Sequence, residues 1–592
     1  MKARQFFQAA RRLPLAVLLY QLRRKGRDLF VSRFPAAYAR RLERWTRSFP
    51  ALDEGTLLPE DLAAFVGRYY RKDNLACEAA GRGVFDLMGR RVDFGSIAAI
   101  DWRHRLEEER DHHLWRMKLC QLEVLHSLLA EGRAGDEQTA EALLDSFEQA
   151  AGFALESPFK TTWAPYGASH RILALLSGLA LAERRGGVCD RLEQRIRMFV
   201  RRDAAFVRAN VEHDLRNNHT ERNLAALCFY GMACTGYDAA QAACLDREVR
   251  AIIEQTILPD GMQVERSAMY QGLSVMSLRI FAAAPFLEGA TRRLARERLR
   301  AAEQAWLLMS HRDGEIVLFN DSWMGEVPVA KAILTDEART DCLPDAGYAR
   351  LSSGLVDLWM DAGAIGPHWN PGHGHADFLA VEVDFAGKRL LVDPGTSQYF
   401  SGPRRAHERS AASHNGPCFV GVEPVDYIGC FKVGRLAAAS SLLLGKGAGL
   451  PPETIGGSLK TSAGTVRRVA APLYGDGMMI ADAWSSRAFA GRSRFLVPGE
   501  WRLAQESPSV VHLRKGACDV WLEVIEGCVQ HAGQDLWCRR YMAPEAAHVL
   551  DVVPRMTSNG QFAAFRISRM PPGSGEGIEN LQALCALARE RL

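Results

Sequence analysis

No apolar run in this 592-residue sequence is long enough to span a bilayer, so a protein built on membrane-spanning helices is excluded. The apolar run at residues 13–20 is at the short limit for a signal peptide, and the basic segment that follows lacks the small residues of a cleavage site. The thirteen cysteines are odd in number and have no paired spacing, which argues against a disulfide framework. We therefore expect a cytoplasmic protein without a transmembrane segment, and a periplasmic or secreted protein is the alternative.

A large net charge is also lacking. The formal net charge is +4, and 47% hydrophobic with 24% charged residues is ordinary for a globular protein. The positive charge is concentrated, because the first fifty residues hold thirteen Lys or Arg against Asp28 and Glu43. This basic leader either contacts an anionic polymer or a membrane surface, or forms the solvated face of amphipathic helices. The remainder is acidic overall and has no nucleic-acid-binding motif, so we expect no nucleic acid partner.

The chain has no clean fixed-period repeat, yet it is too long for one hydrophobic core, so at least two domains are expected. In the first 340 residues, apolar residues recur at three- and four-residue intervals in segments rich in Ala, Leu, Arg and Glu, which predicts helices. These predicted helices are 114–129, 164–182, 191–209, 222–234, 240–257 and 291–310. So many helices with short connections indicate a helical array or toroid.

After Pro344-Asp-Ala-Gly347 the pattern changes to short apolar or alternating runs separated by Gly, Pro, Asp and Ser. This pattern is typical of antiparallel sheets packed as a sandwich. The predicted strands are 355–360, 378–385, 389–392, 478–480, 520–525 and 563–567. We divide the chain into a basic helical region at 1–95, a helical domain at 96–340, a β-sandwich at 341–570, and a linker with a short helix (578–592) at 571–592.

The segment Pro371-Gly-His-Gly-His-Ala-Asp-Phe378 is the most informative part of the sequence. His373, His375 and Asp377 alternate along a run that continues into apolar residues, so on a strand the two histidines would point the same way. Two adjacent imidazoles are costly to protonate together, so we expect a metal, a carboxylate or a substrate between them. A chemical site is therefore favoured over a chance pairing.

Two motifs in the helical half could complete such a site. Asn217, Asn218 and His219 begin an apolar helical segment, where the commonest role of Asn is to cap the helix. Arg266 and Tyr270 are four residues apart, so on a helix they would share a face. A Tyr at helical spacing more often packs in the core than takes part in catalysis. Neither motif by itself therefore indicates a catalytic site.

Together these motifs resemble those of the heparinase II/III-like polysaccharide lyases. The resemblance covers roughly residues 100 to 570 and rests on Asn217-Asn-His219, Asp260-Gly…Glu265-Arg-Ser…Tyr270, His373-Gly-His-Ala-Asp377, Leu391-Val-Asp-Pro-Gly-Thr396 and Arg409-Ser…His414-Asn415. It implies a multidomain α+β fold, in which an N-terminal incomplete (α/α) helical toroid is followed by an antiparallel β-sandwich. The toroid would be the catalytic domain, with the active site in the cleft between the two.

The resemblance also implies the chemistry. Such a lyase breaks the 4-O-glycosidic bond of a uronic acid by β-elimination, and Asn218 would offset the charge of the C5 carboxylate. Tyr270 would protonate the leaving oxygen as general acid, or act as both acid and base. His219 or His373 would otherwise remove the C5 proton as base. An ionised Tyr270 would need help from a cation because its ordinary pKa is near 10, and Arg266 is the candidate.

Substrate binding is expected from a further set of residues. Arginine binds carboxylate and sulfate in a bidentate way, which suits an anionic uronate polysaccharide. The expected substrate-binding residues are Asn217, Glu265, Arg266, Arg404 and Arg409. The family often has His where this chain has Gln271, and residues 397–400 have no secure counterpart in it. Both departures bear on which uronate is accepted.

His375, Asp393 and His414 match the metal ligands of related lyases, where the ion is zinc. Two imidazoles and a carboxylate suit zinc, with water or another group in the fourth position. The resemblance implies that this ion organises the site more than it attacks the substrate. Without a metal, Asp393 would cap a turn and His414 would hydrogen-bond its own loop.

Other classes of function remain open at this stage. A glycoside hydrolase would use two of the acidic residues in these motifs and leave the His and Tyr set unexplained. A metal-dependent hydrolase would explain the metal ligands but leave Asn218 and Tyr270 idle. A non-catalytic glycan-binding or assembly protein would keep the fold and a basic cleft. We favour a lyase acting on a bacterial exopolysaccharide. The sequence leaves open the exact polymer, endo or exo cleavage, the choice of base, the presence of a homodimer and the role of the basic leader.

Overall fold

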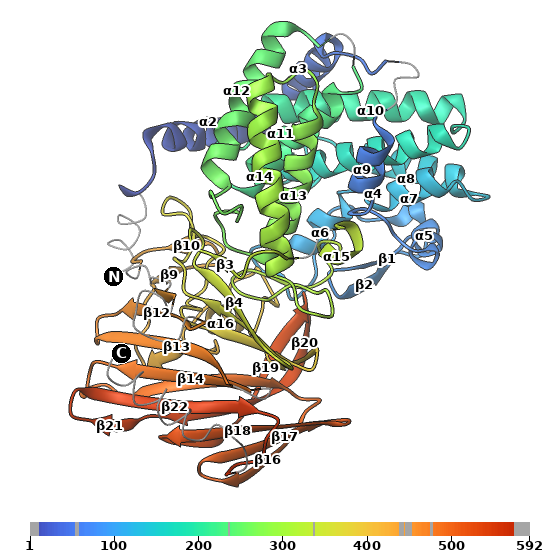
Figure 1. Cartoon of the computed structure of the whole chain (residues 1–592). Coiled ribbons are helices and arrows are strands. Elements are labelled where there is room, and N and C mark those ends of the chain that lie inside the picture. The colour runs from blue at the N-terminus through green and yellow to red at the C-terminus, as the bar shows by residue number, and fades with distance from the viewer. Residues whose placement is uncertain are drawn as a thin grey trace.

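The computed structural model describes residues 11–53, 58–234, 237–335, 338–436, 443–444, 453–473 and 477–573. The expected helix at 578–592 lies outside these residues. The N-terminal half is helical and the C-terminal half consists of antiparallel sheets, and the two halves are stacked on each other (Figure 1). The predicted order of a helical toroid followed by an antiparallel sandwich is confirmed. Within the described ranges, no helix combines the length and the apolar character that a membrane crossing needs.

The helices of the first half pack around a buried centre. Their bounds are α2 Leu15–Arg33, α3 Pro35–Ser48, α4 Glu60–Gly67, α5 Asn74–Gly81, α6 Leu114–Leu119, α7 Val124–Glu131, α8 Asp136–Ala150, α9 Pro165–Arg184, α10 Asp190–Ala209, α11 Asn218–Gly231, α12 Ala239–Thr256, α13 Ala268–Ala283, α14 Gly289–Leu308 and α15 Ala330–Ile333. A hairpin of β1 (Val84–Leu87) and β2 (Arg90–Asp93) lies between α5 and α6. Helices α9, α11 and α13 are buried along most of their surface, whereas α10, α12 and α14 expose a polar face. The first three therefore form the core that the others cover.

The helix predictions agree with the structure except at one place. A single helix at 114–129 is wrong, because α6 ends at Leu119 and α7 begins at Val124. Leu122 between them has a φ of 54°, a left-handed conformation that stops a helix of L-residues. The other five predicted helices correspond to α9, α10, α11, α12 and α14.

The strands form three main sheets. Their bounds are β3 Cys342–Leu343, β4 Tyr348–Ser353, β5 Val356–Asp361, β6 Val381–Phe385, β7 Lys388–Leu391, β8 Pro417–Phe419, β9 Tyr427–Ile428, β10 Lys432–Val433, β11 Leu443–Leu444, β12 Ile455–Lys460, β13 Thr465–Leu473, β14 Gly477–Trp484, β15 Gly491–Pro498, β16 Arg502–Ser507, β17 Val510–Lys515, β18 Cys518–Glu526, β19 Cys528–Arg540, β20 Ala543–Val553, β21 Arg555–Thr557 and β22 Gly560–Ser568. The orders are β3-β4-β5-β6-β7, β19-β20-β15-β8 and β11-β12-β13-β14-β22-β18-β17-β16, with β21 beside β22. A short helix, α16 (Pro403–Glu408), lies between β7 and β8.

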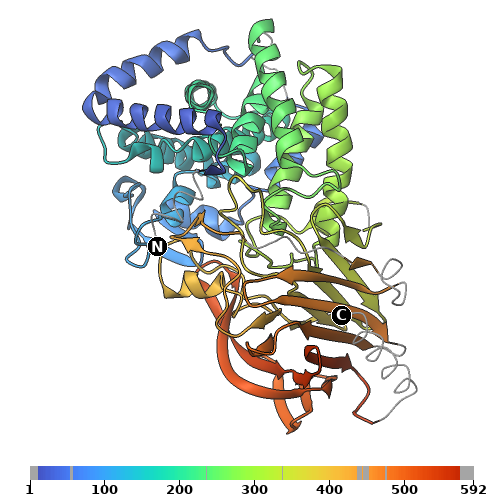
Figure 2. The ribbon, with the colours of Figure 1, turned by 90° about the vertical axis from the view of Figure 1, so that its left-hand side faces the viewer.

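The sheets face each other across an apolar core. Phe495 on β15 and Phe565 on β22 meet edge to face at 5.1 Å between ring centroids, which joins the second sheet to the third. Alternate side chains of β5 and β6, such as Leu358 and Val383, enter the same core. Figure 2 shows these sheets below the helices. The loops at the upper edge of the sandwich consequently face the helical half.

One predicted strand is shorter than expected. Strand β6 begins at Val381, so the expectation of a strand from residue 378, with His373 and His375 at its opening, is wrong. Leu379 has a φ of 61°, which is incompatible with an extended strand. The two histidines therefore belong to a loop, and their relation to each other comes from tertiary contacts.

A buried histidine ties the helical half to the sandwich. His311, which follows α14, has its Nδ1 2.8 Å from Asp384 Oδ1 and its Nε2 2.9 Å from Glu382 Oε2. Burial and Arg389 lower the pKa of His311, but the two carboxylates outweigh them and the pKa is raised. His311 is therefore a cation that compensates two buried carboxylates.

Replacing His311 with Leu is expected to lower the free energy of unfolding by about 3–5 kcal/mol at pH 6, because two buried carboxylates lose their counter-charge. A raised pKa stabilises the fold fully below the ordinary His pKa, and this contribution disappears as pH rises through the folded-state pKa. Urea unfolding at pH 6 and pH 9 should therefore show a smaller difference at pH 9. The exposed His368→Leu is the control. An equal deficit at both pH values would contradict a charged His311.

Candidate active site

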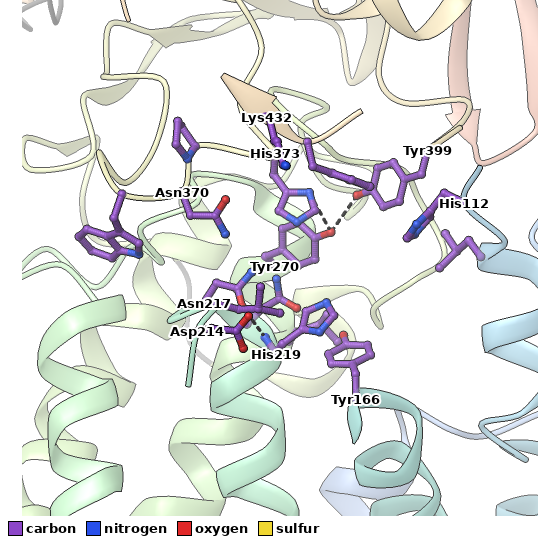
Figure 3. A pocket seen from close by; sticks show the side chains of 18 of the residues that line it. His112, Tyr166, Asp214, Asn217, His219, Tyr270, Asn370, His373, Tyr399 and Lys432 are labelled. Carbon is purple, nitrogen blue, oxygen red and sulfur yellow. Dashed lines mark hydrogen bonds between the residues drawn. The ribbon is translucent and has the colours of Figure 1, made fainter. Parts of the chain in front are cut away.

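A cavity of about 530 Å³ lies where the helical half meets the loops of the sandwich (Figure 3). Its volume is within the range of small-ligand pockets, roughly 300–1,000 Å³. The lining combines aromatic and polar side chains from both halves, including His112, Tyr166, Asn217, Asn218, His219, Tyr270, Trp323, Trp369, His373, Tyr399 and Phe431. The sequence motifs of the two halves thus meet at one cavity.

The start of α11 presents an amide to this cavity. Asn217 caps the helix, because its side chain accepts a hydrogen bond from the His219 backbone N–H at 3.1 Å. Glu265 accepts hydrogen bonds from Asn217 Nδ2 at 3.1 Å and from Asn218 Nδ2 at 2.7 Å. The capping interpretation is correct for Asn217. Asn218 has a second amide hydrogen, so it can donate to a ligand while Glu265 holds its orientation.

Tyr270 stands opposite, near the start of α13. Ser267 caps this helix by accepting from the Tyr270 backbone N–H at 3.3 Å. The Tyr270 hydroxyl is 3.3 Å from His373 Nδ1 and 2.8 Å from the Tyr399 hydroxyl, as the dashed lines in Figure 3 show. Burial raises the pKa of Tyr270 well above 10. This tyrosine therefore keeps its proton at neutral pH, which suits a general acid.

Arg266 does not share a helical face with Tyr270, so that expectation is wrong. The helix begins only after the Ser267 cap, and Arg266 has a φ of 56°. Its guanidinium donates to the carbonyl oxygens of Ala346 at 3.0 Å and Asp345 at 3.3 Å. These contacts join the helical half to the first turn of the sandwich.

Asp321 was missed by the sequence analysis, yet it lies between the two histidines of the loop. Its carboxylate is 2.8 Å from His373 Nδ1 and 2.9 Å from His375 Nε2, and it is also paired with Arg405. Burial raises the pKa of Asp321, but Arg405 and the histidines outweigh burial and hold it well below its ordinary value. The carboxylate is therefore ionised and fixes both imidazoles. The only local signal was a polar Asn-Asp-Ser triplet after the apolar run 316–319.

The loop that carries His373 and His375 is tightly held. A Cβ on Gly374 would lie 2.0 Å from the Ile365 carbonyl oxygen, so only glycine fits between the two histidines. Arg409 is buried and donates to the carbonyl oxygens of Gly372 at 3.1 Å and Gly374 at 3.0 Å. These contacts fix the backbone that orients His373.

His219 lies on another wall of the cavity, beside an acid and an aromatic ring. Its Nδ1 is 3.2 Å from Glu212 Oε1, and its ring stacks on Tyr166 at 4.3 Å between centroids. Burial lowers the pKa of His219, but Glu212 outweighs burial and the pKa is raised. By contrast, burial lowers the pKa of His112 to about 4, so that ring is neutral. Nothing in the sequence distinguished three further residues as site residues, namely Glu212, Tyr166 and His112.

A comparison with known protein families matches one segment of the C-terminal half. Residues 336–474 match the family model described as heparinase II/III-like, C-terminal. This segment is therefore similar to the C-terminal part of heparinase II/III-like proteins. The match bears out the resemblance predicted from the motifs for these residues. No curated protein matches the chain in sequence.

Solved structures match the chain over most of its length. A mutant of the heparan sulfate lyase HepC from Pedobacter heparinus has 13% sequence identity and a TM-score of 0.56, and the match covers 91% of this chain and 88% of that one. A heparinase III structure has 13% identity and a TM-score of 0.63, with 93% of each chain covered. At these identities the likeness shows that the fold is shared.

The arginines expected to bind substrate do not line the 530 Å³ cavity. Arg266 and Arg409 are buried against backbone carbonyl oxygens, as described above. Arg404 pairs with Glu408 at 2.7 Å and Asp535 at 3.0 Å, and lines a separate pocket of about 430 Å³. Substrate contact by these three residues gains no support from the geometry. The cations that line the main cavity are Arg12, Arg24, Lys118 and Lys432.

The three expected metal ligands lie beside the loop. The rings of His375 and His414 are 5.4 Å apart between centroids, and His414 Nδ1 is 2.7 Å from Asp393 Oδ2. His375 Nδ1 and His414 Nε2 are buried without a hydrogen-bond partner among the described residues. Across those same residues, no group of three or more His, Cys, Asp or Glu is arranged to hold a metal ion as placed. The two unpartnered ring nitrogens are nevertheless of a donor type that suits zinc, while Asp393 contacts the other ring nitrogen of His414.

Proposed function

We propose that this protein is a polysaccharide lyase that cleaves an anionic uronate polysaccharide by β-elimination. The observation that carries the proposal is the meeting of Asn218, His219, Tyr270 and His373 at one cavity between the two halves. A hydrolase would leave this set of an amide, a phenol and imidazoles without a role.

The proposed reaction begins with the uronate carboxylate. The Asn218 amide, held by Glu265, donates to this carboxylate and stabilises the negative charge that builds on its oxygens when the C5 proton leaves. His219 accepts the C5 proton. The electron pair of the C5–H bond forms the C4–C5 double bond, and the C4–O4 bond breaks.

The leaving oxygen then needs a proton. Tyr270 supplies it from a hydroxyl that burial keeps protonated, and the proton is later replaced from solvent. His373 and Tyr399 hold this hydroxyl by hydrogen bonds. Asp321 in turn holds His373, so the acid is positioned by a chain of contacts that starts from a buried carboxylate.

The choice of His219 as base makes a pH prediction. A base must be neutral, so activity should rise with pH through a His219 pKa that Glu212 raises. In Glu212→Gln this acidic limb should move to lower pH by about one unit, because an opposite charge close to the ring is lost. The measurement is a pH profile of kcat/KM. Glu156→Gln, at an exposed carboxylate, is the control, and an unmoved limb in Glu212→Gln would transfer the role of base to another group.

The charges of the cavity favour a polymer whose anionic groups are carboxylates. Arg24 pairs with Asp214 at 2.7 Å, and Lys118 pairs with Glu123 at 3.0 Å and with Glu326 at 2.6 Å. Two of the four cations that line the cavity are therefore already neutralised by carboxylates, which lowers the capacity of the cavity for a dense set of sulfates. This supports an exopolysaccharide uronate, of the bacterial type, over a heavily sulfated glycan.

The proposal is tested by incubating the purified protein with heparan sulfate, alginate and uronate-containing bacterial exopolysaccharides. Ultraviolet absorbance reports the new C4–C5 double bond, and a reducing-end assay reports every cleavage. Absorbance and reducing ends that rise together support a lyase and name the substrate class. Reducing ends without absorbance would show a hydrolase, and tight binding without any cleavage would indicate a glycan-binding or assembly protein.

We also propose that His375, Asp393 and His414 bind zinc. A bound ion would supply a positive charge that fixes the sandwich loops beneath His373, and no proton transfer is assigned to it. Elemental analysis of the protein purified without chelator should find about one zinc per chain, and His414→Ala should lose it. Removal of zinc should lower the melting temperature of the wild type and leave that of His414→Ala unchanged. A metal-free wild type that cannot be loaded with zinc would refute this site.

A further inference from the structure

Helix α2 exposes a stripe of leucines along one face. Leu15, Leu19, Leu22 and Leu29 are 72%, 58%, 64% and 72% exposed, and their spacing places them on one side of the helix. Phe30 and Phe34 extend the apolar surface at the end of the helix, at 40% and 53% exposure. Single exposed apolar residues need no explanation, but four leucines on one face of a helix, interrupted only at Gly26, mark an interaction surface.

The opposite face fixes the orientation of α2. Val17 and Val31 are buried, Arg24 pairs with Asp214 at 2.7 Å, and Arg27 donates to Asn210 at 2.9 Å. The ring of Tyr20 also packs against His213. Figure 1 shows α2 at the edge of the helical half, with one side toward the other helices. The leucine row is therefore the outer face of an anchored helix.

Basic side chains flank the row. Arg23 and Lys25 are exposed on its two sides near Leu22, and Arg33 is exposed at its end. Residues 11–50 hold eleven Lys or Arg against Asp28 and Glu43. A second copy of so basic a surface is repelled, whereas a surface of anionic lipid headgroups is attracted.

We infer that α2 is an interfacial helix that docks this protein on an anionic membrane surface. The leucines insert between the lipid headgroups, while Arg23, Lys25 and Arg33 extend to the phosphates. Leu18 and Gln21 of the same helix line the cavity. The cavity therefore lies beside the helix that docks. This inference is independent of the reaction performed in the cavity.

The test is sedimentation of the full chain with vesicles of phosphatidylglycerol and phosphatidylcholine, compared with vesicles of phosphatidylcholine alone. Binding to the anionic vesicles is expected to be at least about tenfold stronger and to weaken as salt is raised. The apolar variant is Leu15→Gln, Leu19→Gln, Leu22→Gln and Leu29→Gln combined. The basic variant is Arg23→Gln, Lys25→Gln and Arg33→Gln combined. Each should lower the affinity at least about tenfold.

The matched control replaces two leucine-sized apolar residues that are equally exposed elsewhere. Leu75→Gln with Met198→Gln, at 74% and 72% exposure on α5 and α10, should bind vesicles like the wild type. Melting curves show whether each variant is folded. Equal binding by the apolar variant, or no binding to either vesicle, would overturn the inference. So would a dimer in sedimentation without lipid that the apolar variant dissociates, because the row would then contact a second copy.

Discussion

Replacing Tyr270 with Phe is expected to lower kcat by about 10²–10⁴-fold and to leave KM nearly unchanged. The substitution removes one hydroxyl and keeps the ring that packs against His373 at 4.7 Å between centroids. Substrate can therefore still enter, but the leaving oxygen has no proton donor. The measurement is the initial rate of ultraviolet absorbance on the polymer that the panel identifies.

The control for this variant is Tyr230→Phe. Tyr230 is also buried, and its hydroxyl donates to the Pro50 carbonyl oxygen at 2.6 Å, in the helical half. Its loss should cost about 1 kcal/mol of stability without changing kcat. If Tyr270→Phe retained more than a tenth of the wild-type kcat, the general acid would have to be another group, and the Tyr270–Tyr399 pair would be a packing contact.

The sequence was sufficient for those parts of the protein that depend on local pattern. Helices α9–α12 and α14 follow from the spacing of apolar residues, and the strands from short alternating runs between turn residues. His373 and His375 were singled out as part of a strand. The backbone at Leu379 prevents the strand from extending that far, and a tertiary contact to Asp321 provides the shared direction instead.

Contacts between distant segments were beyond the reach of the sequence. Asp321 lies 52 residues before His373, and nothing in its neighbourhood marks it as the partner of two histidines. Arg266 and Arg409 were expected to bind substrate because arginine suits anions. In the fold both donate to backbone carbonyl oxygens that no residue pattern identifies. Residue type predicted which functional groups the chain has. The fold decides which of these groups are free to contact a ligand.

A large effect is also expected from substitution of Asp321. Its carboxylate contacts both a buried cation, Arg405, and His373, the histidine beside Tyr270. In Asp321→Asn, Arg405 is left buried without its counter-charge, so the free energy of unfolding should fall by about 3–5 kcal/mol. Asparagine is uncharged and has a single acceptor oxygen where Asp321 serves both His373 and His375, so His373 is held less firmly and kcat should fall by a further factor of about 10–100 under conditions where the variant is folded. Urea unfolding and ultraviolet assays measure the two effects separately.

A matched variant separates stability from positioning. Asp203→Asn breaks a similarly buried pair, in which Asp203 is 2.7 Å from Arg171 inside the helical half, so it should lose stability and keep its kcat. Adding Arg405→Met to Asp321→Asn removes the uncompensated charge and should restore much of the stability, because a buried pair replaced by apolar groups is often tolerated. The kcat should stay low in this double variant, since His373 still lacks its carboxylate. Recovery of kcat together with stability would mean that Asp321 acts only as the counter-charge of Arg405.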